Sequence, residues 1–195
     1  SSDVCSSDLE LCGARLTFNY MRIGGVAWDL PPGYGDKVLE YCDHLEPLIH
    51  EMNDLLSFNK IYVERLANVA PVSAEMAIAY NLVGPNLRGS GLKFDIRKDR
   101  PYSVYSELEF DVPVGSGEMG TLGDCWDRYM VRIHECLESI KLLRQAVRAI
   151  PDGPVIAKVP RNLKPPRGEA HIRVEAARGD MNWYVVSDGR DRKST

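Results

Sequence analysis

The sequence predicts an α+β fold dominated by helices, with one small β-hairpin near its C-terminal end. Residues 36–56 and 124–150 place apolar side chains every three or four positions, which is the period of a helix with one buried face. Residues 170–176 and 181–186 predict two strands joined by a turn that contains Gly179. Helical segments outnumber strands along the chain, and this decides the fold class.

The N-terminal part of the chain predicts an extended segment followed by several helices. Residues 15–26 alternate loosely and end in two glycines, which indicates an extended segment or a short helix that turns there. The helix over residues 36–56 contains Pro47, which predicts a kink or a break because proline lacks a backbone N–H. Residues 60–69 and 73–82 predict two shorter helices, and a serine occupies the N-cap position of the second.

The middle of the chain predicts a long loop and then the longest helix. Residues 84–120 are punctuated by glycine and proline, so we expect a functional loop with short extended pieces. Asp124 is the expected N-cap of the helix that follows. The face expected to be buried carries Trp126, Tyr129, Met130, Ile133, Leu137, Ile140, Leu143, Val147 and Ile150. Residues 158–167 predict a basic linker broken by prolines.

The two ends of the chain do not look like natural coding sequence. Residues 1–9 repeat Ser-Ser-Asp around Val-Cys, and residues 191–195 are Asp-Arg-Lys-Ser-Thr. Ser-Ser-Asp can be encoded TCT-TCC-GAT, and when a C follows, the reverse complement of that run begins GAT-CGG-AAG, which encodes Asp-Arg-Lys. We interpret residues 1–9 and 191–195 as the two strands of one sequencing adapter, the alternative being natural polar tails. Residues 10–190 are then expected to be a partial domain of a longer protein.

Composition excludes several classes of function. The formal net charge is −4, with 44% hydrophobic and 27% charged residues, so a basic nucleic-acid-binding face is not expected. No run of 18 apolar residues occurs, which argues against a membrane-spanning helix. The cysteines outside the terminal tags have no metal-ligand spacing, and we expect them to be small buried hydrophobic residues: Cys12, Cys42, Cys125 and Cys136. No metal site is therefore expected.

Four sequence blocks together resemble a known family. Residues 21–34 are MRIGGVAWDLPPGY, residues 84–115 are GPNLRGSGLKFDIRKDRPYSVYSELEFDVPVG, residues 123–132 are GDCWDRYMVR, and residues 175–189 are EAARGDMNWYVVSDG. Over roughly residues 11–189 the chain resembles the D-type core subunit of the proton-pumping NADH–quinone oxidoreductase, respiratory complex I. This type of subunit is a relative of [NiFe]-hydrogenase large subunits, so the resemblance implies a hydrogenase large-subunit-like helical core.

The resemblance implies a function within a multi-subunit enzyme. The chain would help form the chamber in which electrons from the terminal iron–sulfur cluster reduce quinone, coupled to proton translocation. Quinone would be the substrate, while NADH and the iron–sulfur clusters would be bound by other subunits and not by this chain alone. The expected partners are the B-type iron–sulfur subunit, the C-type and I-type subunits and the H-type membrane subunit. The expected location is peripheral, on the cytoplasmic side of the bacterial inner membrane.

Three residues are candidates for the site. Asp29 lies between two glycines and a proline pair, so its loop cannot relax into a helix, and a carboxylate held there can tune a histidine. The resemblance places Asp29 beside quinone, paired with a histidine that lies outside this chain, together with a partner tyrosine. Arg88 and Arg97 belong to a glycine-rich, alternately charged loop. The resemblance places them near the neighbouring subunit's iron–sulfur cluster, the alternative being a structural role.

Two other classes of function remain open from the sequence. One is the large subunit of a membrane-bound [NiFe]-hydrogenase, whose two CxxC pairs would lie outside this chain. The other is a non-catalytic scaffold subunit. Asn68 and Ala70 replace glycines usual in this segment of the family, from which we expect a less strained turn.

Overall fold

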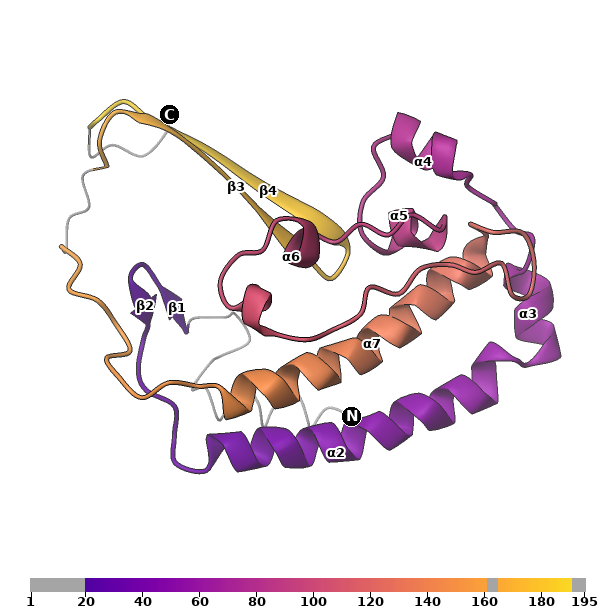
Figure 1. The fold of residues 1–195 in the computed structure, drawn as a ribbon, viewed down its shortest axis with the longest axis horizontal. Helices are drawn as coiled ribbons and strands as arrows, with labels where there is room; N and C mark the ends of the chain where they lie inside the picture. The colour runs from indigo at the N-terminus through magenta and orange to yellow at the C-terminus, as the bar shows by residue number, and fades with distance from the viewer. Residues whose placement is uncertain (1–19, 161–164, 191–195) are drawn as a thin grey trace.

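Two long antiparallel helices form the base of the molecule (Figure 1). The computed structural model describes residues 20–160 and 165–190, so residues 1–9, residues 191–195 and Cys12 lie outside the described residues. Helix α2 spans Tyr34–Met52 and helix α7 spans Cys125–Arg148, and the two lie side by side along most of their length. The short elements and the β-hairpin lie on one side of this pair. None of the described helices is both long and apolar enough to cross a membrane.

The remaining elements are short, apart from one hairpin. The helical ones are the π-helical segment η1 (Asn53–Ser57), α3 (Lys60–Leu66), α4 (Ala74–Ala79), α5 (Pro85–Gly89), α6 (Ile96–Asp99) and the 3-10 turn η2 (Tyr105–Glu107). The strands are β1 (Met21–Arg22), β2 (Gly25–Val26), β3 (Gly168–Ala176) and β4 (Gly179–Ser187). The predicted helix-dominated α+β fold is therefore confirmed.

The seam between α2 and α7 is the main hydrophobic core. Val38, Cys42 and Ile49 of α2 pack against Ile133 and Ile140 of α7, and all five are buried. The spacing of these residues by four or seven positions is what the sequence predicted for two helices with one apolar face each. Burial of this stripe holds the long helices together.

Helix α7 also buries a second side, which the sequence did not predict. Leu142 is 8% exposed and packs with Phe110 and Val112, whereas Leu143, assigned to the core from periodicity, is 41% exposed. The reason is that the loop before the helix runs back across α7 and covers the neighbouring helical position. Ile150, also assigned to the buried face, is exposed as well.

The proline in α2 does not break the helix. The α-helix continues through Pro47 to Met52, so the break expected there is absent, and the irregularity comes later as the π-helical turn η1. Ser57 anchors this turn: its hydroxyl donates to Asn53 Oδ1 at 2.6 Å, and its carbonyl accepts from Trp126 Nε1 at 3.1 Å. The bonds to neighbouring side chains, which sequence spacing does not show, decide where the helix changes its winding.

The helix starts follow the predicted capping chemistry. The hydroxyl of Ser73 accepts from the N–H of Met76 at 3.2 Å, and Asp124 Oδ1 accepts from the N–H of Asp127 at 2.9 Å. The loop over residues 84–120 differs from its prediction, because its short ordered pieces are helical turns and not extended segments. Its glycines and prolines separate these turns.

The turn around Asn68 and Ala70 is also different from the expectation. Both residues have positive φ, 60° and 46°. This is the left-handed region in which glycine is favoured, because a Cβ crowds the backbone there. Replacing the usual glycines with asparagine and alanine therefore adds strain to the turn, and the expectation of less strain was wrong.

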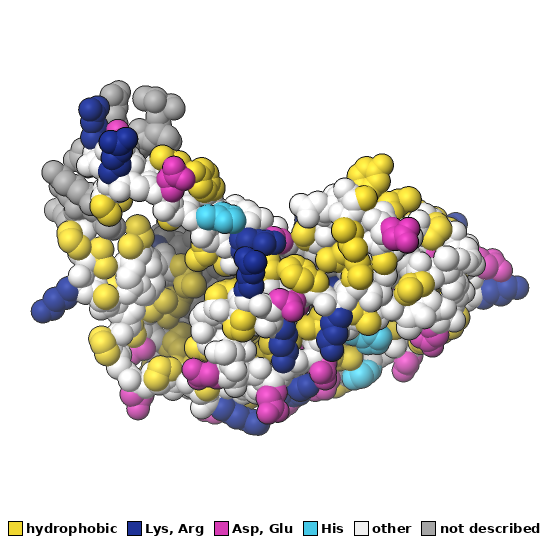
Figure 2. Space-filling model, turned by 45° about the horizontal axis from the view of Figure 1, so that its top comes forward, with side chains coloured by type: hydrophobic (Ala, Val, Ile, Leu, Met, Phe, Trp, Pro, Cys, Tyr) yellow, Lys and Arg dark blue, Asp and Glu magenta, His cyan; other side chains and the backbone are white. Residues whose placement is uncertain are grey.

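The hairpin near the C-terminal end is longer than predicted and has two unlike faces. It pairs β3 with β4 antiparallel from Gly168↔Ser187 to Ala176↔Gly179. Ile172 and Trp183 pair on one face, and His171 and Tyr184 pair on the other. The apolar face is 58% exposed at Ile172 and 59% at Trp183. Figure 2 shows hydrophobic side chains interspersed with charged ones on the visible face of the molecule.

Candidate functional site

Asp29 lies in a loop whose backbone is held in place. The loop follows β2, and Gly25 packs so closely that an added Cβ would lie 2.2 Å from the carbonyl oxygen of Val155. Val26 donates its N–H to the same oxygen at 3.0 Å. The carboxylate of Asp29 is exposed, and its Oδ1 accepts from the N–H of Leu30 at 2.8 Å. The held backbone agrees with the sequence analysis, and the role of the carboxylate stays a prediction.

Arg88 is the centre of a buried ionic cluster, which joins four elements. It lies on α5 and is 2% exposed. Its Nε donates to Glu135 Oε1 on α7 at 2.7 Å, and its Nη1 donates to Glu175 Oε1 on β3 at 2.9 Å. Nη1 also donates to the carbonyl of Phe94 at 3.0 Å and lies 3.5 Å from Asp95 Oδ2 at the start of α6. One guanidinium thus ties together α5, α6, α7 and the hairpin.

Arg97 belongs to the same cluster through Asp95. Its Nη2 and Nε donate to the two oxygens of Asp95 at 2.7 and 3.0 Å, a bidentate pair. Its guanidinium also lies over the rings of Phe110 and Tyr105, at 5.0 and 5.8 Å from their centroids. The structure therefore brings Arg88 and Arg97 together through Asp95. No hydrogen bond or ion pair among the described residues joins Asp29 to either arginine.

Glu135 and Glu175 are the members that the sequence analysis missed. Glu135 lies outside the apolar face expected for the long helix, and Glu175 was only the first residue of a sequence block. Buried charges are usually paired, so a buried arginine requires carboxylate partners, but the sequence does not show which carboxylates these are. Tyr102 completes the contact, because its hydroxyl accepts from the N–H of Glu175 at 3.1 Å. Burial raises the pKa of the Tyr102 hydroxyl.

The cluster has more negative than positive charge. Two arginines face three carboxylates, those of Asp95, Glu135 and Glu175. Burial raises the pKa of Glu135, and the charge of Arg88 opposes this in part. For Arg97, burial lowers the pKa, but the hydrogen bonds to Asp95 more than offset it and leave a net rise. Arg97 therefore keeps its charge despite its partial burial.

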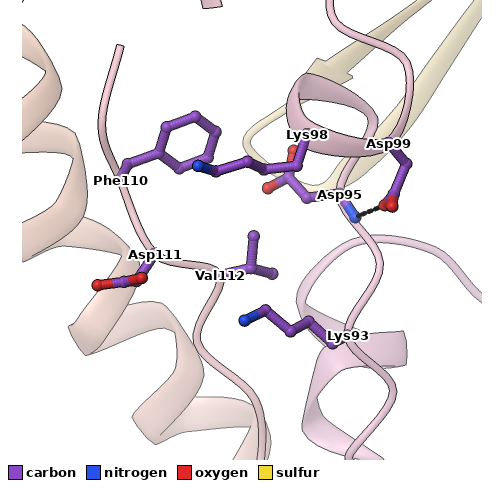
Figure 3. A pocket seen from close by; sticks show the side chains of 7 residues that line it. All are labelled: Lys93, Asp95, Lys98, Asp99, Phe110, Asp111 and Val112. Carbon is purple, nitrogen blue, oxygen red and sulfur yellow. Dashed lines mark hydrogen bonds between the residues drawn. The ribbon is translucent and has the colours of Figure 1, made fainter. Parts of the chain in front are cut away.

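Two of the cavities that adjoin the cluster are lined by further charged side chains. The larger, about 430 Å³, is lined by Arg88, Arg97, Arg132, Glu135, Cys136, Ser139, Glu175, Ala176 and Ala177. Figure 3 shows the smaller, about 280 Å³, between the start of α6 and the loop at 110–112. In it the ammonium group of Lys98 lies 4.5 Å from the ring centroid of Phe110, and Asp99 accepts from the N–H of Asp95 at 2.8 Å. Cys136 is exposed on the rim of the larger cavity, so the expectation that it is buried was wrong, whereas Cys42 is buried.

The start of α7 is fixed by a second buried set of polar groups. Asp124 accepts from the N–H of Asn68 at 2.8 Å, and Asp127 accepts from the N–H groups of Gly117 and Gly123 at 3.0 and 2.9 Å. Arg128 donates to the carbonyls of Gly123 and Ala70. Asp124 and Arg128, four positions apart, thus both bond to backbone groups of the neighbouring loops. They lock the loop at 115–123 and the turn at 68–70 onto the helix that carries Glu135.

Comparison with known proteins identifies the family. Residues 5–163 match the family of the respiratory-chain NADH dehydrogenase 49 Kd subunit. The chain belongs to this family. It is 58% identical over 182 residues to a D-type NADH-quinone oxidoreductase subunit of Anaeromyxobacter dehalogenans strain 2CP-C, and the match covers 93% of this chain and 48% of the relative.

Two further relatives agree. A D-type NADH-quinone oxidoreductase subunit of Sorangium cellulosum strain So ce56 is 57% identical over 185 residues, covering 93% of this chain and 47% of the relative. The D-type subunit of Bacillus anthracis is 50% identical over 182 residues, covering 93% and 48%. The chain thus spans about half the length of the curated relatives it matches. The resemblance inferred from the sequence blocks is confirmed, and it favours the complex I subunit over the hydrogenase subunit.

Proposed function

We propose that this chain is part of the D-type subunit of a proton-pumping NADH–quinone oxidoreductase and helps form the chamber in which quinone is reduced. The observation that carries the proposal is the 50–58% identity, over 93% of the chain, to proteins named as that subunit. In this function the terminal iron–sulfur cluster of a neighbouring subunit passes electrons to quinone one at a time. NADH and the clusters belong to other subunits, in agreement with the lack of a dinucleotide or phosphate-loop motif in the sequence.

Asp29 is the residue of this chain that we assign to quinone reduction. Its backbone is pinned through Gly25 and Val26 to residue 155, while its carboxylate faces outward and one oxygen is engaged with Leu30. A fixed carboxylate that accepts a hydrogen bond from a histidine stabilises the protonated imidazole. The histidine would come from outside this chain. The pair would then hold a proton ready for reduced quinone.

The test is Asp29→Asn in a bacterial complex I whose D-type subunit carries this sequence. The asparagine keeps the shape and loses the charge, so we expect normal complex content and lowered NADH:quinone activity. NADH oxidation by artificial acceptors upstream of quinone should stay near normal. Asp36→Asn, on an exposed first turn of α2, is the matched control and should leave both activities unchanged. Full quinone activity in Asp29→Asn would remove this residue from the mechanism.

For Arg88 and Arg97 the geometry favours the structural alternative over a role beside the iron–sulfur cluster. Both guanidinium groups are neutralised inside the chain by three carboxylates, so the group as a whole does not present net positive charge. Arg97→Gln separates the two roles. A structural role predicts less assembled complex with an unchanged midpoint potential of the neighbouring cluster, and an electrostatic role predicts normal content with a lowered potential.

The position in the complex follows from the same assignment. The chain would sit peripherally on the cytoplasmic face of the inner membrane, in contact with the B-type iron–sulfur subunit, the C-type and I-type subunits and the H-type membrane subunit. Apolar side chains are exposed on the hairpin and on the outer side of α2. This supports a subunit whose surface is covered by partner subunits in the assembled complex. Crosslinking of the intact complex from Lys60 of α3 and Lys158 of the linker would test which of these subunits lie nearest.

A further inference from the structure

The ionic cluster around Arg88 contains one carboxylate that the arginines do not fully compensate. Two guanidinium groups face three carboxylates within contact distance, so one unit of negative charge is left in a buried place. A buried charge without full compensation is costly, and a carboxyl group in that position lowers the cost by binding a proton. The hydrogen bonds and the exposure of the three carboxylates decide which of them does so.

Asp95 is well compensated. Its two oxygens accept from Arg97 at 2.7 and 3.0 Å, and its Oδ1 also accepts from the backbone N–H of that residue at 2.9 Å. It is also the N-cap of α6, where a negative charge is favoured by the orphan backbone donors. Both of its oxygens therefore already have charged or backbone donors.

Glu175 is compensated on both oxygens. Oε1 accepts from Arg88 at 2.9 Å, and Oε2 accepts from the backbone N–H of Ile96 at 3.4 Å. Its side chain is 4% exposed, so water has little access to it. Both of its oxygens therefore already have a donor.

Glu135 differs from both. Arg88 contacts only one of its two carboxylate oxygens, Oε1. This oxygen lies 2.7 Å from Nε and 2.6 Å from Nη2 of Arg88. Its side chain is 18% exposed and lines the cavity of about 430 Å³, which is large enough to bring water to the carboxyl group. Burial raises its pKa, in the direction that favours proton binding. Glu135 thus has an oxygen that Arg88 does not occupy and a route for the proton.

The surroundings of Glu135 on every packed element agree with this choice. Arg88 faces it from α5, and Arg97 and Asp95 face it from α6, where Arg97 lowers the pKa of Glu135 and Asp95 raises it. Glu175 adds a negative charge from β3, and Arg132 and Cys136 of α7 line the same cavity. Although Cys136 is exposed on the rim, partial desolvation of its thiol and the charge of Glu135 raise the pKa of the thiol, which favours its neutral form.

We propose that this cluster is a proton-binding site and that Glu135 is the group that takes up the proton. One proton from water in the cavity adds to Oε2, one O–H bond forms, and the cluster becomes formally neutral. Nothing is oxidised or reduced. Arg88 then keeps its charge balance through Glu175 and Asp95, so the protonated state favours the contacts of Arg88 with β3 and α6 over its contact with α7. The site is separate from Asp29 and does not depend on the role proposed for it.

The test uses the intact complex I with Glu135→Gln, which keeps the shape and removes the titration. The control is Glu138→Gln, one helical turn further along α7, where the carboxylate accepts from the N–H of Asp111 at 2.8 Å. Infrared difference spectra between mildly acid and mildly alkaline pH measure protonated carboxyl groups directly, and potentiometric titration counts the protons bound per complex. We expect the loss of one protonated-carboxyl band and of one proton per complex in Glu135→Gln, and neither loss in Glu138→Gln.

Each other outcome overturns the proposal. The same band and proton count in Glu135→Gln as in the wild type would place the proton elsewhere. Loss of the band in both variants would show a general change of α7 and not a site. Because glutamine mimics the protonated carboxyl group, the proposal requires Glu135→Gln to assemble. A complex that assembles with Glu135→Asp but not with Glu135→Gln would show that the cluster needs the charge and does not bind the proton.

Discussion

Gly115→Ala tests whether the loop at 84–120 approaches itself as closely as the structure describes. Gly115 donates its N–H to the carbonyl of Arg88 at 2.8 Å. A Cβ at this position would lie 2.1 Å from the carbonyl oxygen of Gly89, 2.9 Å from the carbonyl carbon of Gly89 and 3.1 Å from Cβ of Asp127. Gly89 cannot move away easily, because it is itself closely packed against α7. A Cβ added to Gly89 would lie 2.6 Å from Cγ of Arg128. The added methyl group must therefore push backbone against α7.

The cost of this substitution follows from the atoms it meets. Overpacking by one methyl group in a close-packed region costs about 1–3 kcal/mol. The upper end applies here, because the nearest atoms belong to backbone and not to the end of a flexible side chain. A loss of about 3 kcal/mol lowers the ratio of folded to unfolded subunit roughly a hundredfold. The displaced backbone carries Arg88, so the ionic cluster should be disturbed with it.

The assay is the amount of assembled complex on native gels, together with the rate of thermal inactivation of NADH:quinone activity. Gly168→Ala is the matched control, since nothing lies within 4 Å of the Cβ it would add. We expect a marked fall of complex content and faster inactivation for Gly115→Ala, and wild-type behaviour for Gly168→Ala. Equal content and equal inactivation rates in the two variants would refute the close approach of Gly115 to Gly89.

Three other predictions follow from single side chains. Ala70→Gly should slow thermal inactivation. The left-handed backbone conformation costs alanine about 1–2 kcal/mol, whereas the extra conformational entropy of glycine in the unfolded chain costs only about 0.5–1 kcal/mol. Faster inactivation would contradict the positive φ of 46°. Ile140→Ala should cost about 2–5 kcal/mol and Leu143→Ala about 1 kcal/mol or less, so a larger fall of complex content in Leu143→Ala would show that α7 is rotated. A hydrogen bond from Arg173 lowers the pKa of Asp180 below its unfolded value. The pair therefore stabilises the folded chain above the unfolded pKa and loses this effect as pH falls through the folded pKa. The difference in inactivation temperature between wild type and Asp180→Asn should shrink on acidification, and a constant difference would contradict the pairing.

Periodicity predicted the long helices well but not all that they bury. Their apolar spacing and the cap at Asp124 were sufficient to predict two helices with one buried face each, but not that these faces meet in one seam. The burial of Leu142 was not predictable, because it depends on a distant part of the chain, the loop at Phe110, that passes over the helix. Short helical turns inside a loop rich in glycine were missed for a related reason, since each is too short to show a period.

Only the arginines of the ionic cluster, and not their carboxylate partners, stood out in the sequence. Arg88 and Arg97 stood out as charged residues among glycines, but the partners of Arg88 lie 47 positions away, at Glu135, and 87 positions away, at Glu175. Such pairs form by tertiary packing, and no local spacing encodes them. Asp29 was singled out by a sequence block of the family, and the physical part of that argument, a held backbone, is the part that the structure describes.

The β3–β4 hairpin has the geometry of a lever. Its turn is pressed against the start of α5, where a Cβ on Gly84 would lie 2.4 Å from Cα of Gly179, and beside it Glu175 binds Arg88. From there the ribbon extends away from the helices (Figure 1). Nine residues per strand at about 3.3 Å per residue give a length of roughly 30 Å. A tilt of about 5° at the turn therefore carries the opposite end through roughly 2.5 Å, so a small displacement of the Arg88 guanidinium becomes a measurable change of position at Ser187.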